Sequence, residues 1–476
     1  MIHRIAPALM AFTCAAAFLF PVHPARAEEW QITYSVTQEQ LLKDPQGTAA
    51  PKKQERSYIL TITLGQQHLA ADDGHEKRVY NFARRRMLQL NLDKHEYDDW
   101  SLYSNIGSRV REIQNRFAIG ASWRATKFAA QEYFGRFDNE TNLGIVLPEM
   151  KLDEPEPVIE REDLPGGGLD FRHDGLSVVQ FIPATTALPV LFSPRFASFL
   201  AYECNIHPKI RRQLAVADGI PRLLVTHWRL GNQQNTATYR LKSVERLATD
   251  STVVPANFRP APHQEGPFKE LFHVISLVRD PVYVKQRITR DGAGQFAKDV
   301  IAAKRPLDAC LALIEYGLQS GEQNPDDLRQ YKREFEQDNQ CRLYLASLDQ
   351  SSDEACRKSL ASCESIDRTG LRKAYMLDLQ RADLLQILGR GRGGATTPAE
   401  QNQTVTAETL FLKVLAANPF LAGAYHDLGA LYDETFRSSL AWLCFDTGRQ
   451  ISPDHRLLKD ITTLEQRFQH DFLDYF

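Results

Sequence analysis

The chain has 476 residues, with 57 basic and 60 acidic side chains and a formal net charge of −3. This balance gives no field that would favour nucleic acid or an anionic membrane. The length is enough for two or three domains with large cores. After the first segment, no apolar run reaches the ~18 residues of a membrane helix, so we expect no transmembrane anchor in the mature chain.

Residues 1–27 have the organisation of a secretory signal peptide. Arg4 supplies the positive start, residues 5–22 are largely apolar, and Ala25-Arg26-Ala27 is a small-x-small cleavage site. We therefore predict cleavage after Ala27. An alanine-rich signal of this form is typical of bacteria, which predicts a periplasmic or secreted protein.

The pattern from Trp30 onward is mostly that of strands. Residues 58–64 are apolar and β-branched, and residues 78–82 and 86–90 continue with a period of two. Asp72-Asp73-Gly74 predicts one turn between strands. These features predict an antiparallel meander of short strands.

Helical spacing then appears at Val110, Ile113 and Phe117, which predicts a helix on one face of the sheet. Residues 138–175 carry an acidic, proline-containing run and three consecutive glycines, so we expect a long surface excursion there. Strands return at 222–230 and 238–244.

This run of strands, a helix and further strands ends in Pro255-x-x-Phe258. The arrangement resembles the half-open barrel of periplasmic lipoprotein carriers. That resemblance implies a sheet curved around an apolar cavity, and with it a lipid or lipoprotein ligand. Another curved antiparallel sheet with a covering helix is the alternative.

A polar stretch punctuated by prolines between residues 255 and 267 predicts a domain boundary. We expect a β-sheet domain over residues 28–262 and a helical domain over residues 268–476. In the second part the period is helical, as in the stripe of Leu307, Leu311 and Ile314. The predicted fold class is therefore α+β.

Near the end of the chain, large apolar and small residues alternate across a break at spacings typical of two tightly packed helices. The residues are Tyr425, Leu428, Gly429, Tyr432, Ala441, Phe445, Gly448 and Pro453. The pattern resembles the tetratricopeptide repeat (TPR) over residues 422–455. Ala407, Phe411, Val414 and Pro419 repeat the second half of it 34 residues earlier. The resemblance implies a helical solenoid with a concave face.

The family's groove positions fall on Gly423, His426, Ala430, Asp433 and Glu434. By resemblance, these residues would face a bound peptide. Their mixture of His, Asp and Glu favours a basic or polar peptide segment. The alternative is an ordinary solvated helix surface.

Six cysteines remain once Cys14 leaves with the signal peptide, and an even number in an oxidising compartment permits disulfides. Cys341 and Cys363 flank a turn at similar helical distances, so they are the favoured pair. Buried free thiols are the alternative.

Catalytic signatures for serine hydrolases, zinc proteases, nucleotide-phosphate binding and thiol redox chemistry are missing from the sequence. His173-Asp174 could form a base and its orienting carboxylate, and the alternative is a polar pair that is simply exposed to solvent. No cofactor or metal is predicted. We expect a non-enzymatic binding or adaptor protein of the cell envelope that holds a protein or peptide. The alternatives are a lipid or lipoprotein carrier acting through the sheet domain and, third, a hydrolase that uses His173.

Overall fold

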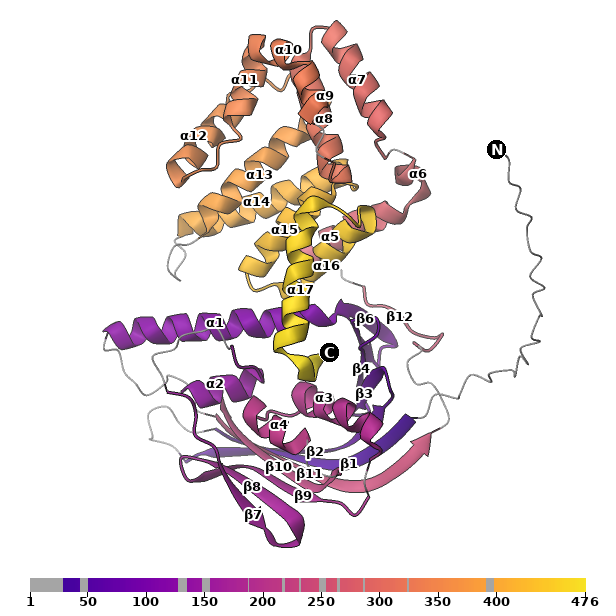
Figure 1. The fold of residues 1–476 in the computed structure, drawn as a ribbon, viewed down its shortest axis with the longest axis vertical. Coiled ribbons are helices and arrows are strands. Elements are labelled where there is room, and N and C mark those ends of the chain that lie inside the picture. The colour runs from indigo at the N-terminus through magenta and orange to yellow at the C-terminus, as the bar shows by residue number, and fades with distance from the viewer. Residues whose placement is uncertain are drawn as a thin grey trace, which may run out of the picture.

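The computed structural model describes most of the chain, in two lobes (Figure 1). The described residues are 29–42, 50–126, 135–147, 155–186, 188–215, 219–230, 233–247, 254–262, 266–285, 287–322, 325–390 and 398–476. The predicted signal peptide lies outside them. A curved sheet forms one lobe and a stack of helices forms the other, which confirms the α+β class.

A twelve-stranded sheet organises the first lobe. Its strands are β1 (Glu29–Leu42), β2 (Lys52–Leu64), β3 (His68–Asp72), β4 (Glu76–Asn81), β5 (Arg86–Asn91), β6 (Glu96–Ser101), β7 (Glu160–Leu164), β8 (Gly168–His173), β9 (Leu176–Pro183), β10 (Pro221–Leu230), β11 (Gln233–Leu247) and β12 (Arg259–Pro260). Their order is β12-β6-β5-β4-β3-β2-β1-β11-β10-β9-β8-β7. All neighbours are antiparallel except β12, which pairs parallel to β6.

The predicted meander is present as β2 to β6. The excursion expected over residues 138–175 was only partly right, because β7 and β8 form a hairpin on the outer edge of the sheet. Gly166 and Gly167 have φ values of 74° and 79° and make its turn. Such left-handed backbone favours glycine, which explains the glycine cluster.

The sheet lobe contains α2 (Arg136–Leu143), the 3₁₀ turn η1 (Pro165–Gly167), η2 (Val190–Phe192), α3 (Ser193–Glu203) and α4 (Pro208–Ala215). Helices α3 and α4 lie over the concave face of the sheet (Figure 1). Phe199 of α3 is fully buried there, and its ring centroid lies 6.4 Å from that of Tyr34 on β1. Apolar side chains of both helices therefore fill the hollow of the sheet.

The helix predicted from Val110, Ile113 and Phe117 is α1 (Leu102–Thr126). It crosses between the two lobes (Figure 1). Ile113 and Phe117 belong to the apolar core of the helical lobe rather than to the core under the sheet. A segment of the N-terminal half is thus built into the C-terminal lobe.

The helical lobe consists of α5 (Gly266–Arg279), α6 (Pro281–Val284), α7 (Arg290–Ala302), α8 (Pro306–Ser320), α9 (Pro325–Gln330), α10 (Lys332–Gln337), α11 (Asn339–Ala346), α12 (Asp353–Glu364), α13 (Tyr375–Gly389), α14 (Pro398–Ala417), α15 (Ala422–Glu434), α16 (Ser438–Ile451), η3 (Arg456–Leu458), α17 (Lys459–Asp471) and η4 (Leu473–Tyr475). In the described parts of the chain, no helix is both long and apolar enough to cross a membrane.

The pair predicted over residues 422–455 is α15 and α16. Gly429 is buried, and a Cβ built on it would lie 2.4 Å from the Phe445 ring. The small residue is therefore required for the close approach of the two helices. Membership of the TPR family stays a prediction, as does the division into domains at residues 262–268.

The six cysteines from Cys204 to Cys444 are buried free thiols in the structure. The bridge favoured between Cys341 and Cys363 is therefore not formed in it. Both side chains are fully buried in the core of the helical lobe. Burial raises the pKa of Cys363 to about 11.

Candidate functional site

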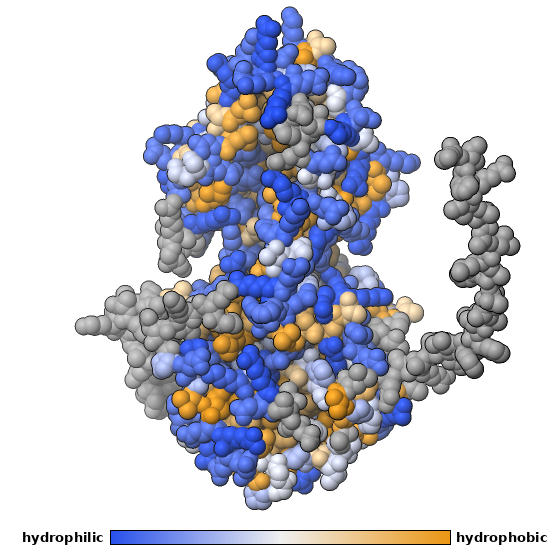
Figure 2. Space-filling model, viewed as in Figure 1, coloured by the Kyte–Doolittle hydropathy of each residue, from blue (hydrophilic) through white to orange (hydrophobic). Residues whose placement is uncertain are grey.

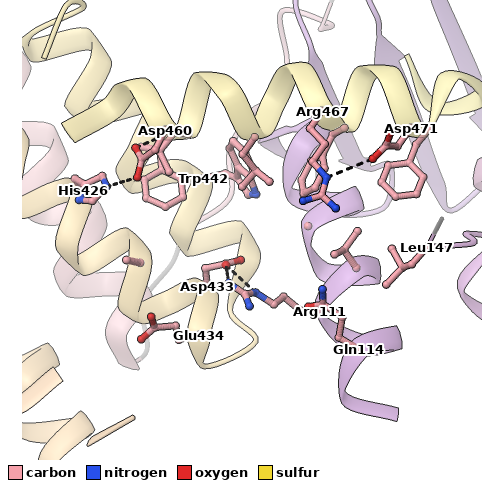
Figure 3. A pocket seen from close by; sticks show the side chains of 18 of the residues that line it. Arg111, Gln114, Leu147, His426, Asp433, Glu434, Trp442, Asp460, Arg467 and Asp471 are labelled. Atoms are coloured by element: carbon pink, nitrogen blue, oxygen red, sulfur yellow. Dashed lines mark hydrogen bonds and ion pairs between the residues drawn. The ribbon is translucent and has the colours of Figure 1, made fainter. Parts of the chain in front are cut away.

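A groove of about 700 Å³ lies where α1 faces α15, α16 and α17. We call it the α1–α17 groove. Its volume falls within the range of about 300–1,000 Å³ typical of ligand sites. Figure 3 shows α17 along one side, α1 opposite to it, and the α15–α16 pair closing the end.

The floor of the groove is apolar and largely aromatic. It is lined by Val110, Leu147, Trp442, Phe445, Ile461, Leu464, Phe468 and Phe472. The rings pack on one another: the centroid of Trp442 lies 5.5 Å from that of Phe445, nearly edge-on, and 6.2 Å from that of Phe468. Such edge-to-face packing holds the floor in one shape.

Gly107 of α1 determines how closely the helix approaches this floor. A Cβ built on Gly107 would lie 2.9 Å from Nε1 of Trp442. Trp442 is 1% exposed, and Nε1 has no hydrogen-bond partner in the described residues. The indole is thus packed beneath α1, at the cost of an unsatisfied N–H group.

The rim consists of paired charges. Arg111 of α1 donates from Nε to Oδ2 of Asp433 at 2.8 Å, and a second contact joins its Nη2 to the same oxygen. Arg390 forms a two-point pair with Glu434, at 3.0 and 2.9 Å. Asp433 and Glu434 are therefore both compensated by an arginine at the rim of the groove.

His426 and α17 make a further rim contact. Nδ1 of His426 lies 2.8 Å from Oδ1 of Asp427, and Nε2 lies 3.4 Å from Oδ2 of Asp460 on α17. Burial lowers the pKa of His426, but the hydrogen bonds and charges of the two aspartates outweigh it and raise that pKa above its ordinary value. The histidine therefore carries charge more readily than a free one and then attracts α17.

The structure brings four of the five predicted groove residues together. His426, Ala430, Asp433 and Glu434 all line the α1–α17 groove. The fifth, Gly423, is buried, and a Cβ built on it would lie 2.8 Å from Leu318 of α8. Gly423 therefore packs against α8 inside the helical lobe and does not line the groove.

Sequence reasoning missed the contribution of α1. Arg111 and Asp433 lie 322 positions apart, and no local pattern connects them. The helical stripe of Val110, Ile113 and Phe117 was visible, but it was assigned to the sheet. The apolar stripe of Ile461, Leu464 and Phe468 on α17 has helical spacing, but that spacing does not indicate which helix it faces.

The alternative site at His173 has a different geometry. Nδ1 of His173 lies 2.9 Å from the carbonyl oxygen of Val158, and Nε2 lies 3.6 Å from Oδ2 of Asp174. The hydroxyl of Ser177 donates to Oδ1 of Asp170 at 2.6 Å. Ser177 is thus held by a carboxylate, unlike a serine activated by an imidazole base.

No protein-family model matches the sequence, and no curated protein matches it either. One solved structure, titled "Lipid-protein interactions in lipovitellin", aligns at 9% identity over 89% of this chain, with a TM-score of 0.20. The chain spans 56% of the length of that structure.

Proposed function

We propose that this chain is an exported, non-enzymatic binding protein of the cell envelope that holds a peptide segment of a partner protein in the α1–α17 groove. One observation carries the proposal: four positions expected to face a peptide open onto a single groove with an aromatic floor. Aromatic side chains dominate binding energies at such surfaces.

The pairing of charges at the rim of the groove indicates which kind of peptide it would hold. Because Asp433 and Glu434 are paired with Arg111 and Arg390, they offer less attraction to a basic peptide than their number implies. Apolar contact with the partly exposed lining residues Val110, Leu147 and Leu464 remains as the main source of affinity. The ligand we propose is therefore amphipathic, with an apolar side chain in the floor and polar groups at the rim.

A groove-blocking substitution tests this function. Ala430 is a small, partly exposed residue of the groove wall, so Ala430→Arg adds bulk without opening the core. Ala361→Arg is the matched control, since Ala361 is exposed on α12 and does not line the groove. The protein should comprise residues 28–476, because α1 supplies one wall.

The measurement is selection of binders from a random peptide library, followed by titration calorimetry. We expect amphipathic peptides that bind the parent and Ala361→Arg equally, and Ala430→Arg at least about tenfold more weakly. If Ala430→Arg binds every selected peptide as well as the parent does, the groove is not the binding site.

The carrier alternative would require space beneath the sheet. Phe199, Leu200 and Ile210 are each fully buried in the core on its concave face. A lipid in that hollow would have to displace α3 and α4. Organic extraction of the purified protein, followed by mass spectrometry, tests this alternative separately: a stoichiometric amphiphile would favour it.

A further inference from the structure

A second cleft, of about 650 Å³, lies at the edge of the sheet and shares no lining residue with the α1–α17 groove. We call it the sheet-edge cleft. The start of α2, residues 155–158, the β8–β9 turn and the β10–β11 hairpin line it. The segments come from four separate parts of the first lobe.

One wall is a column of stacked rings. The His173 ring stacks on Phe137 with centroids 4.1 Å apart, and Phe137 stacks on His207 at 5.0 Å. His207 is fully buried, and its Nε2 lies 2.9 Å from Oε2 of Glu140. The column is therefore anchored in the protein, and His173 is held at the cleft in a fixed position.

The hydrogen-bonding roles of the two cleft histidines follow from their partners. A carbonyl oxygen can only accept, so Nδ1 of His173 carries the hydrogen that is donated to Val158. Its Nε2 faces Oδ2 of Asp174 at 3.6 Å. Burial lowers the pKa of His227, which favours a neutral imidazole, and its Nδ1 lies 2.9 Å from the Thr236 hydroxyl.

Asp138 is the group that the fold leaves unused. Within the described parts of the chain, its carboxylate makes no hydrogen bond and no ion pair, although it is partly buried in the cleft. Burial raises the pKa of Asp138, and the charges of Arg229 and His173 oppose this effect. A polar group without a protein partner in a cleft is available to a ligand.

The remaining lining is neutral and mixed. Trp228 is a partly buried ring, and the amides of Gln234 and Asn235 each offer a donor and an acceptor. The charged side chains nearly balance, since Arg136 and Arg229 oppose Asp138, Glu156 and Asp174. In the described residues, no three histidine, cysteine or acidic side chains converge as metal ligands.

We propose that the sheet-edge cleft binds a neutral, hydroxyl-rich ligand of the oligosaccharide class. Each hydroxyl both donates and accepts, which matches the carboxylate oxygens of Asp138 and the amide of Asn235. The apolar face of a sugar ring covers an aromatic surface such as Trp228. A near balance of charge disfavours a strongly ionic ligand.

The experiment titrates residues 28–476 with three trisaccharides, using saturation-transfer NMR and calorimetry. The neutral probe is cellotriose, the anionic probe is trigalacturonic acid, and the cationic probe is chitosan trisaccharide. The test variant is Asp138→Asn, and the control is Asp93→Asn, at an exposed aspartate outside the cleft. Asp138→Asn keeps the size of the side chain and removes its charge.

We expect cellotriose to bind the parent and Asp93→Asn alike, and Asp138→Asn at least about fivefold more weakly. The groove variant Ala430→Arg should bind cellotriose normally, so this result is independent of the proposed peptide function. The proposal is overturned if cellotriose does not bind the parent, if an ionic probe binds more tightly than cellotriose, or if both aspartate variants behave identically.

Discussion

The hydroxyl of Tyr475 lies 3.0 Å from the carbonyl oxygen of Gly144, and this contact joins the end of the helical lobe to the sheet lobe. The same hydroxyl lies 3.1 Å from the carbonyl oxygen of Ala201 and accepts from Nη1 of Arg109 at 3.1 Å. Nη2 of Arg211 donates to the Gly144 oxygen at 2.8 Å. Tyr475 is 1% exposed, so the two lobes share a buried polar joint.

We predict that Tyr475→Phe destabilises the protein by about 1–3 kcal/mol, because it leaves buried donors and acceptors unsatisfied. The measurement is equilibrium unfolding in urea. Tyr316→Phe is the control: its hydroxyl bonds to the exposed Glu322 at 3.0 Å, so its loss should cost less than about 0.5 kcal/mol. Equal losses in both variants would show that the joint adds no stability.

The contact between Gly107 and Trp442 gives a second prediction. Gly107→Ala places a methyl group 2.9 Å from Nε1 of Trp442, so α1 must move away from α16. We expect a destabilisation of about 1–3 kcal/mol despite the better helix propensity of alanine. Unfolding followed by tryptophan fluorescence measures it. Ser108→Ala, at the exposed neighbouring position, should be neutral or slightly stabilising.

Much of the fold could be predicted from local patterns. The strand β2 was predicted because its residues 58–64 are apolar and β-branched, and β4 and β5 because their side chains alternate. The helices α15 and α16 were predicted because apolar residues recur at helical spacing. The β7–β8 hairpin was missed because β7 is charged and mostly exposed, and backbone pairing alone places it. Edge strands of this kind carry no apolar pattern.

Some residues of the candidate site could likewise be predicted from the sequence, and others could not. His426 and Ala430 were found because the resemblance to the tetratricopeptide repeat implies groove positions there, whereas Arg111 was not, because its partner Asp433 is distant in sequence. The filling of the concave face by Phe199 was also unpredictable. A curved sheet with a covering helix and one with a cavity have the same alternation along their strands.

The state of the cysteines gives a third prediction. Burial raises the pKa of Cys310 to about 12 and keeps its thiol protonated near neutral pH. We expect the folded chain of residues 28–476 to react slowly with Ellman's reagent and to show six reactive thiols in concentrated urea without reductant. Four thiols before reduction and six after it would establish one disulfide, with Cys341 and Cys363 as the first pair to test by peptide mapping.

His426 gives a prediction about pH. The groups that face it are Asp427 on its own helix, Asp460 on α17 and His455 beside η3, and Asp427 in turn faces Asp383 of α13. Burial lowers the pKa of His426, but the hydrogen bonds and charges of Asp427 and Asp460 outweigh it and raise that pKa in the folded state. Its stabilising contribution is then fully present below the unfolded pKa of about 6.5 and is lost as pH rises through the higher folded pKa.

We therefore expect His426→Gln to be less stable than the parent at pH 6, by up to about 1 kcal/mol because Asp460 is largely exposed. The difference should shrink as the pH is raised towards about 9, because the parent histidine loses its proton as the pH passes its folded pKa. Unfolding in urea across this pH range measures it. Asp460→Asn should reduce the same pH dependence, because it removes the partner on α17. A difference between the parent and His426→Gln that stays constant with pH would mean that the histidine contributes through packing rather than through charge.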